Sequence, residues 1–217
     1  MDSNPVIPIV IERVKEIHTT PRWGGEPYWE HPLRCHARLV EQWKSVPLEV
    51  QVAMLFHDTL EDVHLGEHVL IHCLVELSRH NPSLDGSNIW RMVRDVTNPE
   101  EMGREEVITE IVARFREGRV QPESYLLKIF DIWDNTTDLV ATCRSAEGVP
   151  DELRAKVARS ARKYMLYLDA IEDGWHTHGI AQAVSTKSDL SSVMTSAVTG
   201  IRDALEQINH FVGDAAN

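Results

Sequence analysis

The sequence predicts an all-α fold, a bundle of about eight helices with a C-terminal helical extension. Apolar residues recur at spacings of three and four along most of the chain, and sustained alternation of apolar and polar residues is nearly absent. Prolines, glycines and short polar runs divide this pattern into segments of helical length. With 217 residues, 42% of them hydrophobic, the chain can bury a sizeable core.

The first predicted helix covers residues 6–18 and is followed by the segment TTPRWGGEPYWEHP, whose two glycines and three prolines predict a structured loop. The next helix covers residues 33–43. Ser45 as a cap and Pro47 in the first turn then begin a helix that contains LEVQVAMLFHDTLED. The remaining predicted helices of the body cover residues 67–78, 89–96, 104–117, 121–142 and 151–173.

Two domains are predicted, a main body at residues 1–175 and an extension at residues 176–217. The extension is richer in Ser, Thr, Ala and Gly and contains one amphipathic segment, residues 193–211. This segment is expected to form a helix that packs on the body or on another subunit. A homodimer is therefore a reasonable expectation.

The composition excludes several classes of partner. A formal net charge of −12 repels polyanions, so no nucleic-acid partner is predicted. No stretch approaches 18 apolar residues and the N-terminus lacks a basic signal-peptide region, so no membrane span or secretion signal is expected. The cysteines, Cys35, Cys73 and Cys143, form no CxxC pair, which predicts neither a disulfide framework nor a cysteine zinc site and favours the cytoplasm. A phosphorylated substrate would need a local device such as a metal ion.

The segment FHDTLED places four ionisable residues, His57, Asp58, Glu61 and Asp62, directly after a buried apolar run. On a helix His57 and Asp58 point about 100° apart, yet they can converge on one ion at a helix end. An imidazole beside a carboxylate suits Mn²⁺, Fe²⁺ or Zn²⁺. The alternative is a solvated helix end with an ordinary surface or core histidine.

Two other segments supply candidate ligands. His31 follows a Gly-Glu-Pro turn that can fix its backbone, and His36 competes with it for the same role. Asp131 lies inside an apolar helix, where a carboxylate is unfavourable to bury unless it is paired or bound to metal. Together with His57 and Asp58, His31 and Asp131 would complete a four-ligand set with open positions for water and substrate.

Three motifs in order carry a resemblance to a known family: GEPYxxHP at residues 25–32, HDxxED at residues 57–62 and KxxDxxxN at residues 128–135. This combination resembles the HD-domain phosphohydrolases, and specifically the alarmone hydrolase domain of the RelA/SpoT type, including the single-domain small alarmone hydrolases. MVRDVTNPEEM at residues 92–102 is also similar to a segment of that family. The resemblance covers about residues 5–173 and implies an HD-domain helical bundle.

The resemblance implies a metal-dependent hydrolase that removes pyrophosphate from the 3′ position of a guanosine polyphosphate such as ppGpp. Two histidines and two aspartates would hold one divalent cation, with Mn²⁺ expected; these are His31, His57, Asp58 and Asp131. Glu61 and Asp62 would be the catalytic carboxylates that orient or deprotonate the attacking water. Such roles agree with general chemistry, because a cation acidifies water and a nearby carboxylate accepts its proton.

Several residues are candidates for substrate binding. Arg22 stands where the family has an arginine that contacts the base, whereas Trp23 replaces a family lysine. An indole stacks on a purine but does not attract phosphate, so the purine preference is expected to survive more securely than the phosphate pattern. Further candidates are Asn135, one turn after Asp131, and the basic-aromatic pair Lys163 and Tyr164.

Each of these further candidates has a structural alternative: an exposed helix asparagine for Asn135, and a surface lysine over a core tyrosine for Lys163 and Tyr164. Asp134 and Asp138 are interpreted as solvated. His64, His68 and His72 share one helical face and are interpreted as a surface stripe or an intersubunit contact rather than as a second metal site.

Two other functions fit the same scaffold. One is a nucleoside 5′-phosphatase or a deoxynucleotide triphosphohydrolase, against which the HDxxED spacing argues by resemblance. The other is a non-catalytic nucleotide sensor, which would be expected to have lost a metal ligand.

Overall fold

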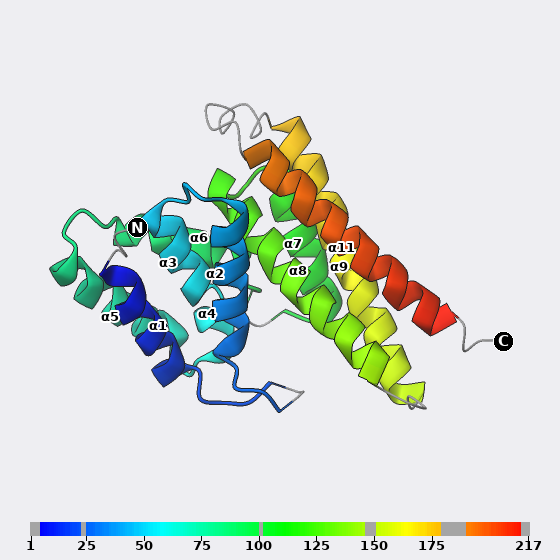
Figure 1. Ribbon diagram of the computed structural model, residues 1–217. Coiled ribbons are helices and arrows are strands. Elements are labelled where there is room, and N and C mark those ends of the chain that lie inside the picture. The colour runs from blue at the N-terminus through cyan, green and yellow to red at the C-terminus, as the bar shows by residue number, and fades with distance from the viewer. Residues whose placement is uncertain (1–4, 23–24, 100–101, 146–150, 179–189, 214–217) are drawn as a thin grey trace. The chain divides into compact units, whose positions relative to one another are not determined.

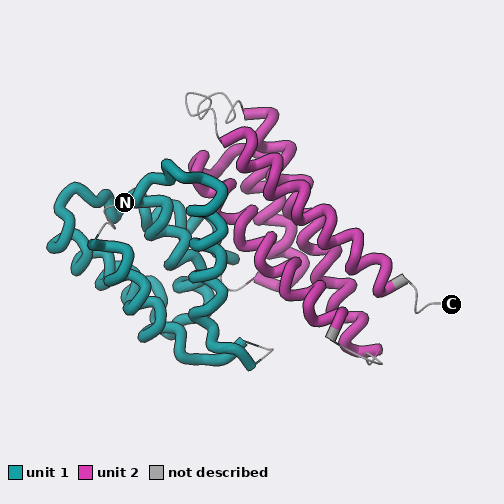
Figure 2. The backbone as a smooth tube through the Cα atoms, in the orientation of Figure 1, with its two compact units in different colours: residues 1–98 teal, residues 99–217 magenta. Residues whose placement is uncertain are grey.

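A computed structural model describes residues 5–22, 25–99, 102–145, 151–178 and 190–213 (Figure 1). These residues are mainly helical, and the extended pairing found among them is an isolated bridge between Pro21 and Pro27. The prediction of an all-α fold is confirmed. The chain divides into two compact units, residues 1–98 and residues 99–217 (Figure 2), and each is described by itself.

Unit 1 is built around a short central helix. Its helices are α1 (Val6–Ile17), α2 (Glu30–Gln42), α3 (Leu48–Phe56), α4 (Thr59–Asp62), α5 (Gly66–His80) and α6 (Gly86–Val96). Helix α3 packs against α1, α2 and α6, and residues 52–56 are completely buried. Because the last turn of α3 is apolar and buried all round, the residue that follows Phe56 lies inside the protein.

The helix predicted to run through FHDTLED is interrupted at His57 and Asp58. Helix α3 ends at Phe56, the two residues form a turn, and α4 begins at Thr59. The Nδ1–H group of His57 donates to the carbonyl oxygen of Met54 at 2.8 Å. In a continuing helix that carbonyl would accept from the Asp58 N–H, so the side chain competes with the helical bond and favours the break.

A close contact between backbones fixes how α5 follows α4. Leu65 has a left-handed backbone conformation, with φ of 56°, and α5 starts at Gly66. A Cβ atom on Gly66 would lie 2.2 Å from the carbonyl oxygen of Thr59. Glycine is therefore required where α5 passes the start of α4.

Unit 2 contains four described helices: α7 (Arg104–Arg116), α8 (Pro122–Ser145), α9 (Asp151–Thr177) and α11 (Leu190–Gly213). Helix α9 packs against α7 and α8, and α11 packs on α8 and α9. The predicted boundary between residues 175 and 176 falls near the end of α9, and the predicted domain division stays a prediction. None of the helices described in either unit is long and apolar enough to cross a membrane.

The interpretation of Asp134 as solvated is wrong. Its exposed fraction is 1%. Helix α8 packs against both α9 and α11, and on a helix with several packed faces the charge of a side chain does not by itself indicate exposure.

Two glycines that each begin a helix offer a matched test of this packing. We expect Gly66→Ala to lower the free energy of unfolding by about 1 to 3 kcal/mol, because its Cβ meets backbone that cannot move aside. In Gly86→Ala the new Cβ lies 3.5 Å from its nearest neighbour, the Cβ of Leu74, so stability should change by less than about 1 kcal/mol. Urea denaturation of both variants checks the contrast, and equal losses would contradict it.

Candidate functional site

Three candidate metal-binding side chains, two imidazoles and one carboxylate, converge in unit 1. The Nε2 atoms of His31 and His57 lie 3.3 Å apart. Nε2 of His57 is 3.2 Å from Oδ1 of Asp58, and Nε2 of His31 is 3.4 Å from Oδ2 of the same carboxylate. His31 stands in the first turn of α2, while His57 and Asp58 form the break between α3 and α4.

These distances fit a metal ion. Bonds of about 2.1 Å to nitrogen and oxygen, at angles of about 90 to 110°, set donor separations of about 3.0 to 3.4 Å. His31 and His57 are only 1% and 2% exposed, whereas the side chain of Asp58 is 14% exposed. Two buried imidazoles and a more accessible carboxylate therefore form a site that an ion can reach from the side of Asp58.

The tautomer of His57 strengthens this interpretation. Because a carbonyl oxygen only accepts, the bond to Met54 places a proton on Nδ1 of His57. In the neutral ring Nε2 then carries a lone pair that faces the carboxylate of Asp58 and a ring nitrogen of His31. A single proton joins at most two of these atoms, whereas one metal ion can bond all three.

His36, the alternative to His31, lies elsewhere on α2. Its Nε2 atom is 3.2 Å from Oε1 of Gln51 on α3. Of the two histidines, His31 is the one whose ring meets His57, with ring centroids 5.1 Å apart.

Asp62 joins the cluster through Tyr28. The Tyr28 hydroxyl lies 3.0 Å from Oδ2 of Asp58 and also contacts Oδ2 of Asp62. One hydroxyl proton is thus shared between a candidate ligand and a candidate proton acceptor. Desolvation and the charge of Asp58 raise the pKa of the Asp62 carboxyl to about 6. Burial and the same two carboxylates raise the pKa of the Tyr28 phenol, so it stays protonated.

A neutral imidazole, that of His18, stacks on the ring of Tyr28. The two ring centroids lie 5.2 Å apart and the ring planes are inclined at 12°. His18 is 2% exposed, and neither of its ring nitrogens has a hydrogen-bond partner among the described residues. Burial lowers the pKa of His18 to about 4, so at neutral pH it adds no positive charge to balance Asp58 and Asp62.

The loop before α2 positions both Tyr28 and Arg22. Backbone bonds run from Arg22 N–H to the Glu26 carbonyl at 2.9 Å and from Tyr28 N–H to the Thr20 carbonyl at 3.3 Å, and Gly25 takes the left-handed conformation that closes the turn. The Arg22 guanidinium lies 5.8 Å from the centre of the Tyr28 ring. Trp23, the other predicted substrate contact here, lies outside the described residues.

Glu61 makes different contacts from Asp62. Its Oε1 atom accepts from the backbone N–H of Asn98 at 2.7 Å, and its other oxygen accepts from the Asn98 side chain. Glu61 therefore anchors the segment after α6, while Asp62 is the carboxylate that shares a hydroxyl with Asp58. The catalytic roles of Glu61 and Asp62 stay predictions.

The third motif lies in unit 2, on α8. Oδ2 of Asp131 is 3.0 Å from Nζ of Lys128, and Asn135 donates to the Asp131 carbonyl at 3.0 Å and also to its Oδ1. Asp131 is 7% exposed and is thus a paired buried carboxylate. Each carboxylate oxygen can accept a second partner, so these contacts leave Asp131 able to bind a cation. Whether it joins the donors of unit 1 stays a prediction.

The remaining predicted substrate contacts gather near the same part of unit 2. Nζ of Lys163 lies 4.4 Å from the centre of the Tyr164 ring and 5.8 Å from that of Tyr167, and Nζ of Lys128 lies 5.7 Å from the Tyr167 ring. Lys128 and Tyr167 are buried, whereas Lys163 and Tyr164 are half-buried, so the latter pair is the more open to solvent. A lysine beside an aromatic ring suits a nucleotide, whose base stacks and whose phosphates are anionic.

Two site residues were missed in the sequence. In the sequence Tyr28 stands out only as part of the GEPY motif, whereas in the structure its hydroxyl contacts both Asp58 and Asp62. Cys35 was set aside because it has no CxxC partner, yet its sulfur and ring nitrogens of His31 and His57 all lie within 4.8 Å of one another. The HxxxC spacing, which places two side chains on one helical face, was the signal that could have found it.

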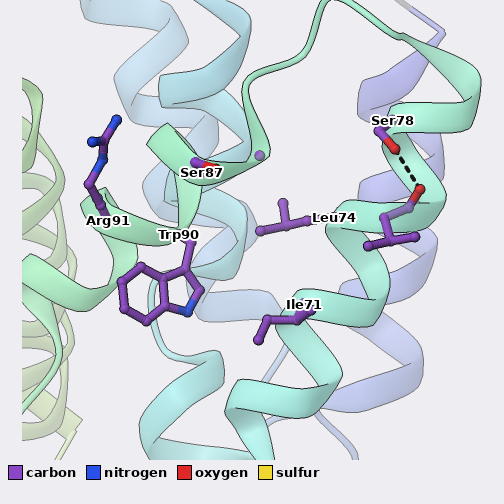
Figure 3. A pocket seen from close by; sticks show the side chains of 8 residues that line it. Ile71, Leu74, Ser78, Ser87, Trp90 and Arg91 are labelled. Atoms are coloured by element: carbon purple, nitrogen blue, oxygen red, sulfur yellow. Dashed lines mark hydrogen bonds between the residues drawn. The ribbon is translucent and has the colours of Figure 1, made fainter.

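The histidine stripe and a nearby groove lie apart from these donors. His64, His68 and His72 are exposed on and before α5, and no described group of three metal donors includes them. A groove of about 560 Å³ opens between α5 and α6, where Trp90 faces Ile71 and Leu74 (Figure 3). Its lining is mainly apolar and contains none of the residues of the metal cluster.

Comparisons with known proteins support the fold. No family model matches the sequence, and no curated protein matches it. Among solved structures, the chain is similar to a metazoan ortholog of SpoT that hydrolyses ppGpp and plays a role in starvation responses. The match has a TM-score of 0.60 at 16% identity and covers 83% of this chain and 99% of the other. The resemblance drawn from the three motifs is thereby confirmed at the level of the fold: the chain has the all-α HD-domain fold of that hydrolase.

The raised pKa of Asp62 predicts a pH-dependent effect on stability. The unfolded carboxyl loses its proton near pH 4 and the folded one near pH 6, so ionised Asp62 destabilises the metal-free protein above about pH 6. We expect Asp62→Asn to raise the melting temperature by about 2 °C at about pH 8 and to change it little at about pH 4. The exposed Asp203→Asn serves as control in the same thermal scans. An equal gain at both pH values would contradict the assignment.

The buried pair of Asp131 and Lys128 predicts a difference between two substitutions. Asp131→Ala removes one partner of a buried ion pair and should lower the free energy of unfolding by about 3 kcal/mol. Asp131→Asn keeps an oxygen for Lys128 and should lose clearly less. Denaturant unfolding of both variants checks this, and a loss below about 1 kcal/mol for Asp131→Ala would show that the pair carries little energy.

Proposed function

We propose that this chain is a divalent-metal-dependent phosphohydrolase that removes pyrophosphate from the 3′ position of a guanosine polyphosphate such as ppGpp. The observation that carries the proposal is the convergence of His31, His57 and Asp58 at metal-ligand distances, with Asp62 tied to Asp58 through one hydroxyl. The fold shared with a ppGpp hydrolase supports the choice of reaction.

The proposed centre has four ligands. His31, His57 and Asp58 would hold Mn²⁺, and Asp131 is proposed as the fourth ligand. When bound, the cation offsets phosphate charge and makes a nearby water more acidic. Histidine nitrogens with carboxylate oxygens suit Mn²⁺, although the same set also accepts other divalent metals.

Asp62 is the proposed proton acceptor. A carboxylate whose pKa is about 6 is mostly ionised at neutral pH and is still basic enough to take a proton during the reaction. The Tyr28 hydroxyl contacts both Asp58 and Asp62 and so fixes the position of the Asp62 carboxylate relative to Asp58. The proposed base and the proposed metal ligand therefore keep a constant separation. The stacked His18 and the Arg22 guanidinium limit the movement of the Tyr28 ring.

The nucleotide would be bound by local basic and aromatic groups, because the net charge of −12 repels it from most of the surface. We propose that Arg22 and Trp23 contact the purine. Lys163 would approach phosphate, while Tyr164 and Asn135 would contact the ribose. Arginine beside an aromatic ring is suited to stacking on a base, and lysine acts on phosphate as a compact charge.

Product analysis by mass spectrometry tests the function directly. With Mn²⁺ and ppGpp, we expect the protein to release pyrophosphate and GDP. Asp58→Asn should lower kcat by about a thousandfold, because losing a ligand removes several kcal/mol of transition-state stabilisation. Glu67→Gln, on the exposed face of α5, is the matched control and should leave turnover unchanged.

The same product analysis distinguishes the proposed activity from the alternative functions of this fold. Release of phosphate from the 5′ side of a nucleotide, or of triphosphate from a deoxynucleotide, would show that the protein is a hydrolase with a different substrate from the one proposed. Tight nucleotide binding without any product, in protein shown to contain Mn²⁺, would contradict an enzyme and indicate a sensor.

A further inference from the structure

The two histidines of the proposed centre have a second neighbour that the proposed reaction does not use. Sγ of Cys35 lies 3.7 Å from Nδ1 and 3.9 Å from Nε2 of His31. Cys35 is one turn after His31 on α2, so both side chains leave the same face of the helix. The thiol, like both histidines, is buried.

The distances suit a thiolate ligand to a tetrahedral ion. With Zn–S bonds of about 2.3 Å and Zn–N bonds of about 2.1 Å, sulfur and nitrogen ligands lie about 3.6 Å apart. The observed separation from Nε2 of His31 exceeds this by a few tenths of an ångström, and the sulfur lies within 4.8 Å of a ring nitrogen of His57, so a rotation of the Cys35 side chain has to close both gaps. A sulfur donor beside two imidazoles favours Zn²⁺, Co²⁺ or Cd²⁺, whereas a carboxylate in its place favours Mn²⁺.

We propose that His31, Cys35 and His57 form an alternative site for thiophilic divalent cations, which shares its two histidines with the oxygen-containing set of His31, His57 and Asp58. One ion at a time can use the shared nitrogens, so zinc-like ions and Mn²⁺ exclude each other. Binding through Cys35 forms a metal–sulfur bond and releases the thiol proton to solvent. The inference rests on the metal centre of the proposed function and is independent of which nucleotide is hydrolysed.

Because the Cys35 thiol is buried, it would lose its proton only when a metal ion binds. An unpaired thiolate in an apolar environment is unfavourable, and a bound cation offsets its charge. Cys73 on α5 is also buried, but no described group of three metal donors includes it. It therefore provides a matched control for Cys35 in the same unit.

Absorption spectroscopy of the full-length, metal-free protein titrated with Co²⁺ tests the proposal. We expect a near-ultraviolet thiolate-to-cobalt charge-transfer band in the wild type and in Cys73→Val, and its loss in Cys35→Val. Valine fits a buried cysteine position closely, and circular dichroism of both variants verifies that they fold. Absence of the band in the wild type, or its persistence in Cys35→Val, would overturn the proposal.

A competition experiment supplies a second readout. With Mn²⁺ followed by electron paramagnetic resonance, Cd²⁺ should displace it from the wild type at a concentration about tenfold lower than from Cys35→Val, while the two proteins bind Mn²⁺ alike. Equal displacement would overturn the inference. If the thiolate band is present but no nucleotide is hydrolysed, the proposed function fails and the Cys35 site stands; hydrolysis without the band gives the reverse result.

Discussion

The hydrogen bond from His57 Nδ1–H to the Met54 carbonyl is the interaction on which the site depends. It lies at the end of a helix whose last five residues are completely buried, and it favours ending the helix at that residue. It also leaves the lone pair of His57 Nε2 directed at Asp58 and His31. Two adjacent residues that would point apart on a helix can therefore reach one ion, and we propose that FHDTLED is charged because its turn supplies metal ligands inside the core.

Charge balance explains the groups around this break. Asp58 and Asp62 are anionic neighbours, while Tyr28 and His18, which fill the space beside them, are both neutral at physiological pH. A bound metal ion would offset the negative charge of Asp58 and Asp62. In unit 2, Lys128 supplies a positive charge beside Asp131.

Helical periodicity was sufficient to predict the fold class and most helix positions, because period and breakers are local properties. Motif order predicted His31, His57, Asp58 and Asp131 as one ligand set. The structure places the first three side by side, and the part of Asp131 in the set stays a prediction. Contacts between distant segments were not available from the sequence: Tyr28 meets Asp62 across 34 positions, and Asp134 is buried on α8, which packs against helices later in the chain. The absence of a CxxC pair gave no sign of the contacts of Cys35, because its neighbours are two histidines, one of them in the turn after α3.

A diffraction experiment can decide where the protein binds a metal ion. A crystal of the full-length protein loaded with Mn²⁺, measured with anomalous scattering at the manganese edge, locates the ion directly. We predict one strong peak bonded to Nε2 of His31, Nε2 of His57 and the carboxylates of Asp58 and Asp131. A peak elsewhere, for example on His64, His68 or His72, with the His31 and His57 rings turned from each other, would contradict the central claim.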